Sequence, residues 1–228
     1  MTAELSGPAQ SAADWFVCPI CGRDLAAIAP STLGCPTGHS FEVSRRGYFA
    51  LASGSSGLMR SEPADALDAI DRRWSADRAP VLEALDAATP TATGRRVLDV
   101  GSDLGHALSR VLGGRPGWRA LHAGPSPAGV ARTIANAGCD GLLLDPIRPW
   151  PIRDGAADVA LAVGGVPSPV ELHRILAPGG VLVTAIDGGD VDPAQVIDDL
   201  FPWFEHDQTR SVSGGVVLRL RRRRRVWH

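Results

Sequence analysis

The sequence has no lysine, one tyrosine, two methionines and four cysteines, and its formal net charge is only −2. This near balance of charge excludes a protein that coats nucleic acid by bulk charge, although a local basic patch remains compatible with it. No apolar run approaches the ~18 residues of a membrane span. Residues 1–17 have neither the basic nor the apolar region of a secretory signal. We therefore expect a cytoplasmic protein.

The domain organisation follows from shifts in composition along the 228 residues, of which 44% are hydrophobic. That length and hydrophobic content provide for one or two folded domains. The boundaries that we predict are a disordered tail at 1–14, a zinc ribbon at 15–50, a linker at 51–63 and an α/β domain at 64–228. The linker is rich in glycine and serine, which bury little and leave the backbone flexible.

The α/β domain is predicted from short apolar runs that alternate with helical periodicity, each closed by glycine or proline. This alternation is typical of a parallel sheet covered on both faces by helices. The expected helices lie at 64–88 with a break at Pro80, and at 104–112, 126–137, 169–176 and 193–201. The expected strands lie at 95–100, 118–122, 141–144, 157–163, 181–186 and 215–220.

Four potential metal ligands form the most specific motif, a Cys-x2-Cys pair followed by a Cys-x3-His pair. They are Cys18, Cys21, Cys35 and His39. Thiolate and imidazole are the ligands of tetrahedral Zn²⁺, and four of them leave no open position, so the motif predicts a structural zinc site. The alternative is disulfides or buried thiols. The fourth cysteine, Cys139, lies far along the chain, which leaves an odd number here for bridges.

A glycine-containing turn follows the first predicted strand of the α/β domain. Gly101 permits a tight turn close to a ligand, Gly105 permits close packing of the next helix, and the Asp99 carboxylate can order the loop. The spacing is neither that of a dinucleotide-binding fingerprint nor that of a P-loop. An ordinary strand-to-helix turn is the alternative interpretation.

Residues 98–105 resemble motif I of the Rossmann-like S-adenosylmethionine methyltransferases. Asp145 resembles the acidic residue that meets the adenine, and 150–158 and 172–182 resemble the segments that precede strands four and five. With the Cys/His ribbon and Arg46-Gly47-Tyr48, the chain is similar to the large-subunit ribosomal RNA guanine-N1 methyltransferases, which include macrolide-resistance enzymes of the tylosin type.

This resemblance implies a doubly wound Rossmann-like domain and two cofactors, S-adenosylmethionine and structural Zn(II). The cofactor would be held by Asp99, Gly101, Gly105 and Asp145. It also implies ribosomal RNA as partner, with guanine N1 as the acceptor; a homodimer is left open. The catalytic residue is unknown. His122, Asp145 and the loop 164–168 are candidates by position, but that loop contains no ionisable side chain.

Two departures from the family pattern support an alternative function. Asp103 stands where the family has a glycine, and would bring a charge to the cofactor loop. The second strand ends without the acidic residue that bonds the ribose, and His122 is the nearest polar side chain. The alternatives are a catalytically degenerate protein that binds RNA, protein or a small molecule, and a small-molecule methyltransferase.

An arginine cluster at Arg219 and Arg221–Arg225 could contact RNA phosphates or could be a solvated tail. Arg45 and Arg46 form a second candidate phosphate site. For Tyr48 and Phe49 we favour a place in the core of the small N-terminal domain over base stacking.

Overall fold

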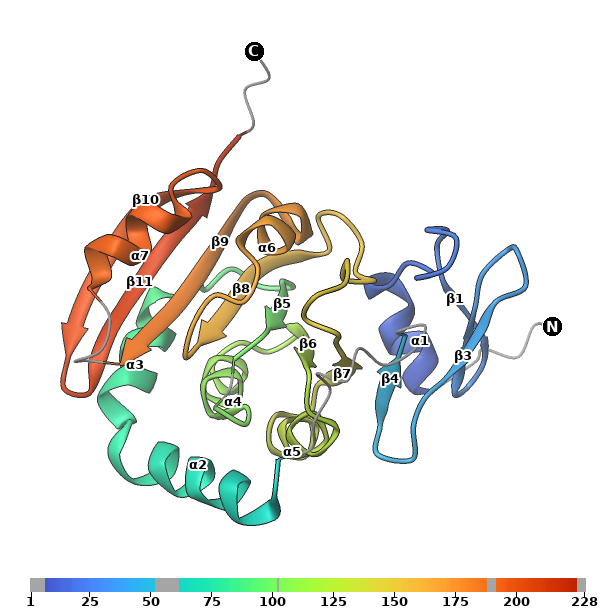
Figure 1. Cartoon of the computed structure of the whole chain (residues 1–228), viewed down its shortest axis with the longest axis horizontal. Coiled ribbons are helices and arrows are strands. Elements are labelled where there is room, and N and C mark those ends of the chain that lie inside the picture. The colour runs from blue at the N-terminus through green and yellow to red at the C-terminus, as the bar shows by residue number, and fades with distance from the viewer. Residues whose placement is uncertain (1–6, 52–61, 102, 188–191, 225–228) are drawn as a thin grey trace.

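The computed structural model describes residues 7–51, 62–101, 103–187 and 192–224. An N-terminal segment of small elements precedes a large α/β unit (Figure 1). The N-terminal elements are α1 (Pro8–Ala12), the 3-10 helix η1 (Ala13–Trp15), β1 (Ala26–Ala29), β2 (Thr32–Gly34), β3 (Ser40–Glu42) and β4 (Tyr48–Ala50). The α/β unit contains α2 (Ala64–Asp77), α3 (Ala79–Ala88), β5 (Arg96–Asp99), α4 (His106–Gly113), β6 (Arg119–Gly124), α5 (Pro127–Ala137), β7 (Asp140–Leu143), β8 (Ala157–Val163), α6 (Pro169–Ile175), β9 (Leu176–Asp187), α7 (Pro193–Leu200), β10 (Phe204–Val212) and β11 (Gly215–Arg222).

The main sheet has eight strands in the order β10-β11-β9-β8-β5-β6-β7-β4. The strands from β4 to β9 run parallel, whereas β11 pairs antiparallel with β9 and β10 pairs antiparallel with β11. The chain leaves β5 through α4 toward β6 and returns to the other side of β5 with β8. Ligands of open α/β sheets bind at such a reversal, beyond the carboxyl ends of the strands.

The faces of the sheet carry separate hydrophobic clusters, because successive residues of a strand point to opposite sides. In β5, Val97 belongs to the cluster under α3 and α4, and Leu98 belongs to the cluster that includes α1 and α6. The second cluster continues without a break into Phe16, Leu33 and Phe49 of the N-terminal segment. Phe49 is buried as predicted, but its core is shared with the main sheet and is not a separate core of the small N-terminal domain.

The structure differs from the sequence-based expectation at both ends of the N-terminal segment. Residues 8–12, expected in a disordered tail, form α1, with Ala9 and Ala12 fully buried. Small side chains allow this helix to approach β1 and β7 closely. Because the segment has few large apolar side chains, its sequence does not predict a buried helix. Strand β4, expected inside the ribbon, pairs with β7 at the edge of the main sheet. Of the metal-ligand motif, Cys35 and His39 lie between β2 and β3 of the three-stranded sheet β1-β2-β3, and Cys18 and Cys21 lie in the turn that precedes β1.

The predicted helix at 64–88 is two helices, α2 and α3, that meet at Arg78, with Pro80 in the first turn of α3. Proline fits a first helical turn because the amide hydrogen that it lacks has no intrahelical partner there. In Figure 1, α2 runs across the lower end of the molecule near α4 and α5. It therefore lies across the edge where the parallel strands end.

The remaining predicted elements of the α/β unit agree with the structure within a few residues, except that β9 begins at Leu176 and includes 178–180, which lie before the strand predicted at 181–186. Strand β10 was not predicted: seven of its nine residues are exposed, so it lacks the alternation by which strands are recognised. Most of the linker predicted at 51–63 lies outside the described residues.

Candidate cofactor and metal sites

The ends of β5 and β6 bring a buried carboxylate and a buried imidazole together. Asp99 is fully buried and His122 is 4% exposed. His122 Nδ1 lies 2.7 Å from Asp99 Oδ2, and Asp99 Oδ1 accepts a hydrogen bond of 3.1 Å from the amide of Gly101. The carboxylate thus orders both the turn after β5 and the imidazole, and the loop-ordering role expected of Asp99 is what the geometry displays.

A cavity of about 150 Å³ lies over this pair and is called the β5–β6 cavity here. Its polar contributors include His122, Ser126 and Glu62, and its apolar walls come from α2, α5 and the turn after β5. The lining residues are Glu62, Leu67, Ile70, Val100, Gly101, Leu104, His122, Gly124, Pro125, Ser126, Gly129, Val130 and Thr133. Of the predicted cofactor residues, Gly101 lines this cavity.

Both glycines of the predicted cofactor turn stand where a larger residue would collide. A Cβ on Gly101 would lie 3.1 Å from Asp99 Oδ1 and from the backbone nitrogen of Val163. Gly105 has φ +84°, and a Cβ there would lie 2.9 Å from Thr133 Cγ2 of α5. Gly105 therefore serves the packing of α4 against α5.

Asp103 was expected to bring its charge to the cofactor, and the structure places it elsewhere. The side chain is fully buried and accepts hydrogen bonds from the amides of Gly105 (3.2 Å) and Ala107 (2.6 Å). It thus caps the N-terminus of α4, where free amide hydrogens favour a carboxylate. Asp103 is not among the described residues that line the β5–β6 cavity.

Asp103 should make stability depend on pH. Burial, followed by repulsion from Asp99, raises its pKa from 3.8 to about 6. Folding therefore favours the protonated form, and the contribution of Asp103 falls as the pH rises between 3.8 and about 6. Relative to Asp103→Ser, which keeps a capping oxygen without the charge, the wild type should lose about 3 kcal/mol of unfolding free energy across this window.

Urea unfolding of both proteins at pH 4, 5, 6 and 7 would measure this difference. A difference in unfolding free energy that stays constant over the series would contradict the raised pKa.

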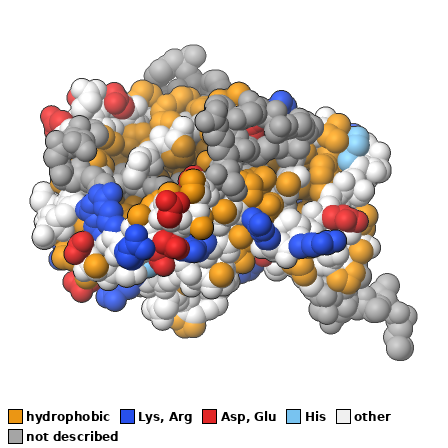
Figure 2. All heavy atoms as spheres, turned by 60° about the horizontal axis from the view of Figure 1, so that its bottom comes forward, with side chains coloured by type: hydrophobic (Ala, Val, Ile, Leu, Met, Phe, Trp, Pro, Cys, Tyr) orange, Lys and Arg blue, Asp and Glu red, His pale blue; other side chains and the backbone are white. Residues whose placement is uncertain are grey.

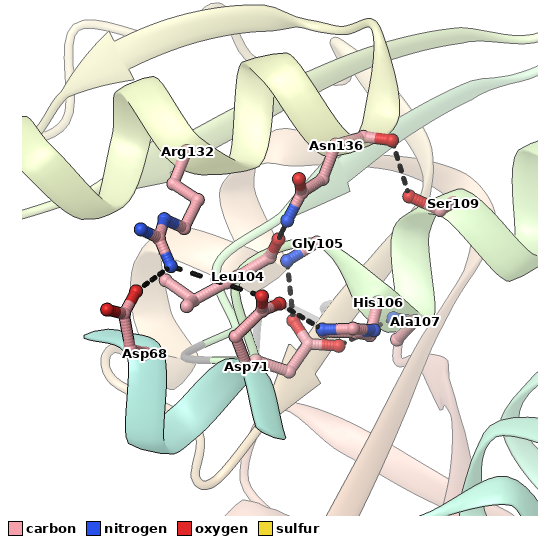
Figure 3. Close-up of polar contacts among 10 residues, drawn as sticks. Asp68, Asp71, Leu104, Gly105, His106, Ala107, Ser109, Arg132 and Asn136 are labelled. Atoms are coloured by element: carbon pink, nitrogen blue, oxygen red, sulfur yellow. Dashed lines mark hydrogen bonds and ion pairs between the residues drawn. The ribbon is translucent and has the colours of Figure 1, made fainter. Parts of the chain in front are cut away.

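Helix α2 lines the β5–β6 cavity, and it contacts α5 through an ion pair and α4 through a carboxylate–imidazole hydrogen bond; Figure 3 shows both contacts. Asp68 Oδ1 lies 2.7 Å from Arg132 Nη1, and Asp71 Oδ1 lies 2.7 Å from His106 Nε2. The two aspartates are three residues apart and so share a face of α2. These pairs are partly exposed, so they contribute orientation more than stability.

Asp145 lies outside the β5–β6 cavity. It is 3% exposed, its Oδ1 accepts a 3.2 Å hydrogen bond from the amide of Ile147, and its Oδ2 lies 3.2 Å from Arg148 Nε. It lines a second cavity of about 290 Å³ between the N-terminal segment and the β7–β8 connection, together with Cys18 and Trp150. The predicted adenine contact of Asp145 thus stays a prediction.

The four predicted metal ligands converge, with all ligand atoms within 4.8 Å of one another. Cys21 Sγ and Cys35 Sγ are 3.8 Å apart, and His39 Nδ1 lies 3.5 Å from Cys18 Sγ and 3.4 Å from Cys35 Sγ. A tetrahedral ion with 2.3 Å metal–sulfur bonds requires sulfur–sulfur edges of about 3.8 Å. The cluster therefore fits such an ion.

A threonine outside the motif supports this cluster. Thr37 Oγ1 lies 3.1 Å from Cys21 Sγ, 3.0 Å from Cys35 Sγ and 3.2 Å from His39 Nδ1. Burial opposes ionisation of Cys35, but hydrogen bonds from the Thr37 hydroxyl and from the amides of Thr37 and His39 outweigh it, and the pKa of this thiol is lowered to about 6. The hydrogen bond from Thr37 likewise lowers the pKa of Cys21. Both shifts favour the thiolate, which is the form that binds metal.

The other candidate features have largely structural places. Gly164 and Gly165 have φ of +84° and +132°, in agreement with a tight turn at the end of β8. Arg219 and Arg221 both pair with Asp207, at 2.8 and 3.0 Å, so part of the cationic run is neutralised within the sheet. Figure 2, which brings the lower side of Figure 1 forward, shows acidic and basic side chains interspersed on this face rather than one continuous basic surface. Arg225 lies outside the described residues.

No helix in the part of the chain that the structure describes is long and apolar enough to cross a membrane.

Solved structures with this fold are methyltransferases and related proteins. A chain of the Haloferax volcanii complex containing the Trm112 methyltransferase activator aligns with a TM-score of 0.62 and 16% identity, over 72% of this chain and 97% of that one. A TehB-like S-adenosylmethionine-dependent methyltransferase from Corynebacterium glutamicum aligns with a TM-score of 0.55 and 14% identity, over 71% and 100%. The fold is that of the Rossmann-like S-adenosylmethionine methyltransferases.

Sequence comparison shows which methyltransferases within this fold class the chain is related to. The chain is 33% identical over 192 residues to a Streptomyces fradiae 23S rRNA (guanine(748)-N(1))-methyltransferase, covering 80% of this chain and 66% of that protein. It is 28% identical to a Micromonospora griseorubida protein provisionally named for the same guanine-N1 activity, over 82% and 76%. The chain belongs to the family of these methyltransferases, and it spans about two thirds of the Streptomyces relative. It matches no protein-family model.

Proposed function

We propose that this protein is an S-adenosylmethionine-dependent methyltransferase that modifies guanine N1 in 23S ribosomal RNA. The observation that carries the proposal is the 33% identity to a relative of that activity, which extends over 80% of the chain. The methyltransferase fold and the metal-ligand cluster are consistent with it.

The lining of the β5–β6 cavity suits the adenosine part of such a cofactor, and its volume of about 150 Å³ would have to grow on binding, because ligand pockets usually measure at least ~300 Å³. Its walls are apolar, as a nucleobase requires, and His122 and Ser126 supply polar groups near Gly101. Glu62 supplies a carboxylate suited to a cationic ligand. When bound, the cofactor supplies an activated methyl group on a sulfonium. The protein's part is then to position donor and acceptor, with Asp99 ordering the turn and α2 excluding water from above.

The metal cluster is proposed to hold structural Zn²⁺ through Cys18, Cys21, Cys35 and His39. Its closed set of four ligands leaves no position for catalysis. The β1-β2-β3 sheet would then be a rigid surface beside the α/β unit, available to the RNA acceptor. The exposed Arg45 and Arg46 after β3 are the arginines of this part of the chain that suit phosphate contacts.

Methyl transfer should be detectable on 23S rRNA extracted from a strain that lacks this modification. Methylation at N1 removes the hydrogen that pairs with cytosine, so reverse transcription should stop one nucleotide before the modified guanine. We expect one new stop that depends on both the protein and S-adenosylmethionine. If no stop forms although the protein binds S-adenosylhomocysteine, rRNA is not the acceptor.

A small-molecule acceptor is the second candidate, and one observation favours it. Arg219 and Arg221, which were predicted to contact phosphates, are paired with Asp207. If the acceptor is a small molecule, the protein should bind the cofactor but should not methylate rRNA. A catalytically degenerate protein, in contrast, would methylate neither rRNA nor a small molecule.

A further inference from the structure

The β5–β6 cavity is lined by two buried side chains, His122 and Thr133, each with a polar atom that no described residue satisfies. His122 comes from the end of β6 and lines the cavity beside Gly101 and Gly124. Its Nδ1 is held by Asp99 Oδ2 at 2.7 Å, and no described residue forms a hydrogen bond with its Nε2. A buried imidazole with only one nitrogen satisfied is expected to find a second partner.

The pairing with Asp99 fixes what that nitrogen can do. A carboxylate only accepts hydrogen bonds, so Nδ1 carries a proton toward Asp99, and Nε2 is the ring nitrogen left to contact a ligand. Asp99 also accepts from the amide of Gly101, so the imidazole and the turn are held by one group. Nε2 is therefore preorganised by a fully buried partner.

Gly124 keeps Nε2 accessible. A Cβ on this glycine would lie 3.0 Å from Nε2 and 3.4 Å from Val130 Cγ2, so any larger residue would cover the nitrogen. Gly124 does not have a positive φ, so its backbone does not require glycine. Its missing side chain instead opens a path from the cavity to the imidazole.

We propose that His122 Nε2 accepts a hydrogen bond from a ribose hydroxyl of the adenosyl cofactor, with Asp99 as its positioning residue and Gly124 as the opening. This proposal rests on the proposed function and deepens it. The imidazole, supported by a buried carboxylate, does here what an acidic side chain at the end of the second strand would do directly. A hydroxyl suits this nitrogen, since it can donate a hydrogen to it and carries no charge.

The test compares S-adenosylhomocysteine with its 2′-deoxy and 3′-deoxy analogues by calorimetry. We expect the wild type to bind the parent compound roughly 10-fold more tightly than the analogue that lacks the bonded hydroxyl, as one hydrogen bond gives. His122→Ala should bind the parent and that analogue alike. Gly124→Ala should lose the same discrimination with the imidazole intact. His206→Ala, which removes an exposed histidine of β10, is the control and should discriminate as the wild type does.

A second measurement needs no variant. With ¹⁵N-labelled histidine, the Nε2 resonance of His122 should shift on addition of S-adenosylhomocysteine, and should shift less with the deoxy analogue. The proposal is overturned if His122→Ala still prefers S-adenosylhomocysteine over the deoxy analogue as strongly as the wild type does. It is also overturned if this variant transfers methyl groups more slowly but shows unchanged affinities. The proposed function would survive both results. Absence of any binding by the wild type would overturn both.

Discussion

Replacing Cys35 by serine is expected to release the metal and to lower the melting temperature of the whole chain by roughly 10 °C or more. A small segment with little core of its own obtains much of its folding free energy from the ion. The loss should spread, because Phe16, Leu33 and Phe49 belong to the hydrophobic cluster of the main sheet and β4 pairs with β7. Metal content by mass spectrometry and thermal unfolding would measure both effects.

Cys139→Ser is the matched control for this experiment. Cys139 lies outside the ligand cluster, and burial raises the pKa of its thiol to about 12, so it stays protonated. This variant should retain stoichiometric zinc and should melt near the wild type. The structural-zinc proposal would be wrong if Cys35→Ser held as much zinc as the control.

Replacing Gly101 by valine is expected to weaken binding of S-adenosylhomocysteine roughly 100-fold, which corresponds to about 2.7 kcal/mol. Already the first added carbon would lie 3.1 Å from Asp99 Oδ1 and from Val163, and the remaining methyl groups must displace the turn or enter the cavity. Either movement disturbs the carboxylate that holds His122. Calorimetry on the folded variant, checked by circular dichroism, would give the ratio of dissociation constants.

Gly113→Val provides the comparison at the other end of α4. A Cβ at Gly113 meets no atom within 4 Å, so the same substitution should change affinity less than 2-fold there, as expected for an open position. Equal affinities for the two variants would mean that the β5–β6 cavity is not the cofactor site.

Local signals were sufficient for most of the secondary structure. Ser126 and Gly138 bracket α5 in the sequence, and in the structure Ser126 Oγ accepts from the amide of Gly129 while Gly138 ends the helix at φ +65°. Such signals act within one turn, so they need no tertiary information. The metal motif was predictable for the same reason, because each pair of ligands sits on a single tight turn.

The functions of Asp103 and His122 could not be assigned in this way. The family pattern has a glycine at position 103, so the sequence predicts that Asp103 disturbs the cofactor loop. In the structure its carboxylate instead accepts hydrogen bonds from amides at the start of α4. His122 appears in the sequence as a weak substitute for an acidic residue. Its partner Asp99 lies 23 residues earlier and meets it only because β5 and β6 pair in register.

The sequence by itself determined the α/β class, the order of the helices and strands, the four metal ligands and the glycine turn after β5. These depend on periodicity, on chain-breaking residues and on spacing within short segments. Only the tertiary structure decided that β4 joins the main sheet, that Asp145 and Gly101 line different cavities, and that α2 lines the β5–β6 cavity. Those outcomes depend on contacts between residues far apart in the chain, which no local pattern encodes.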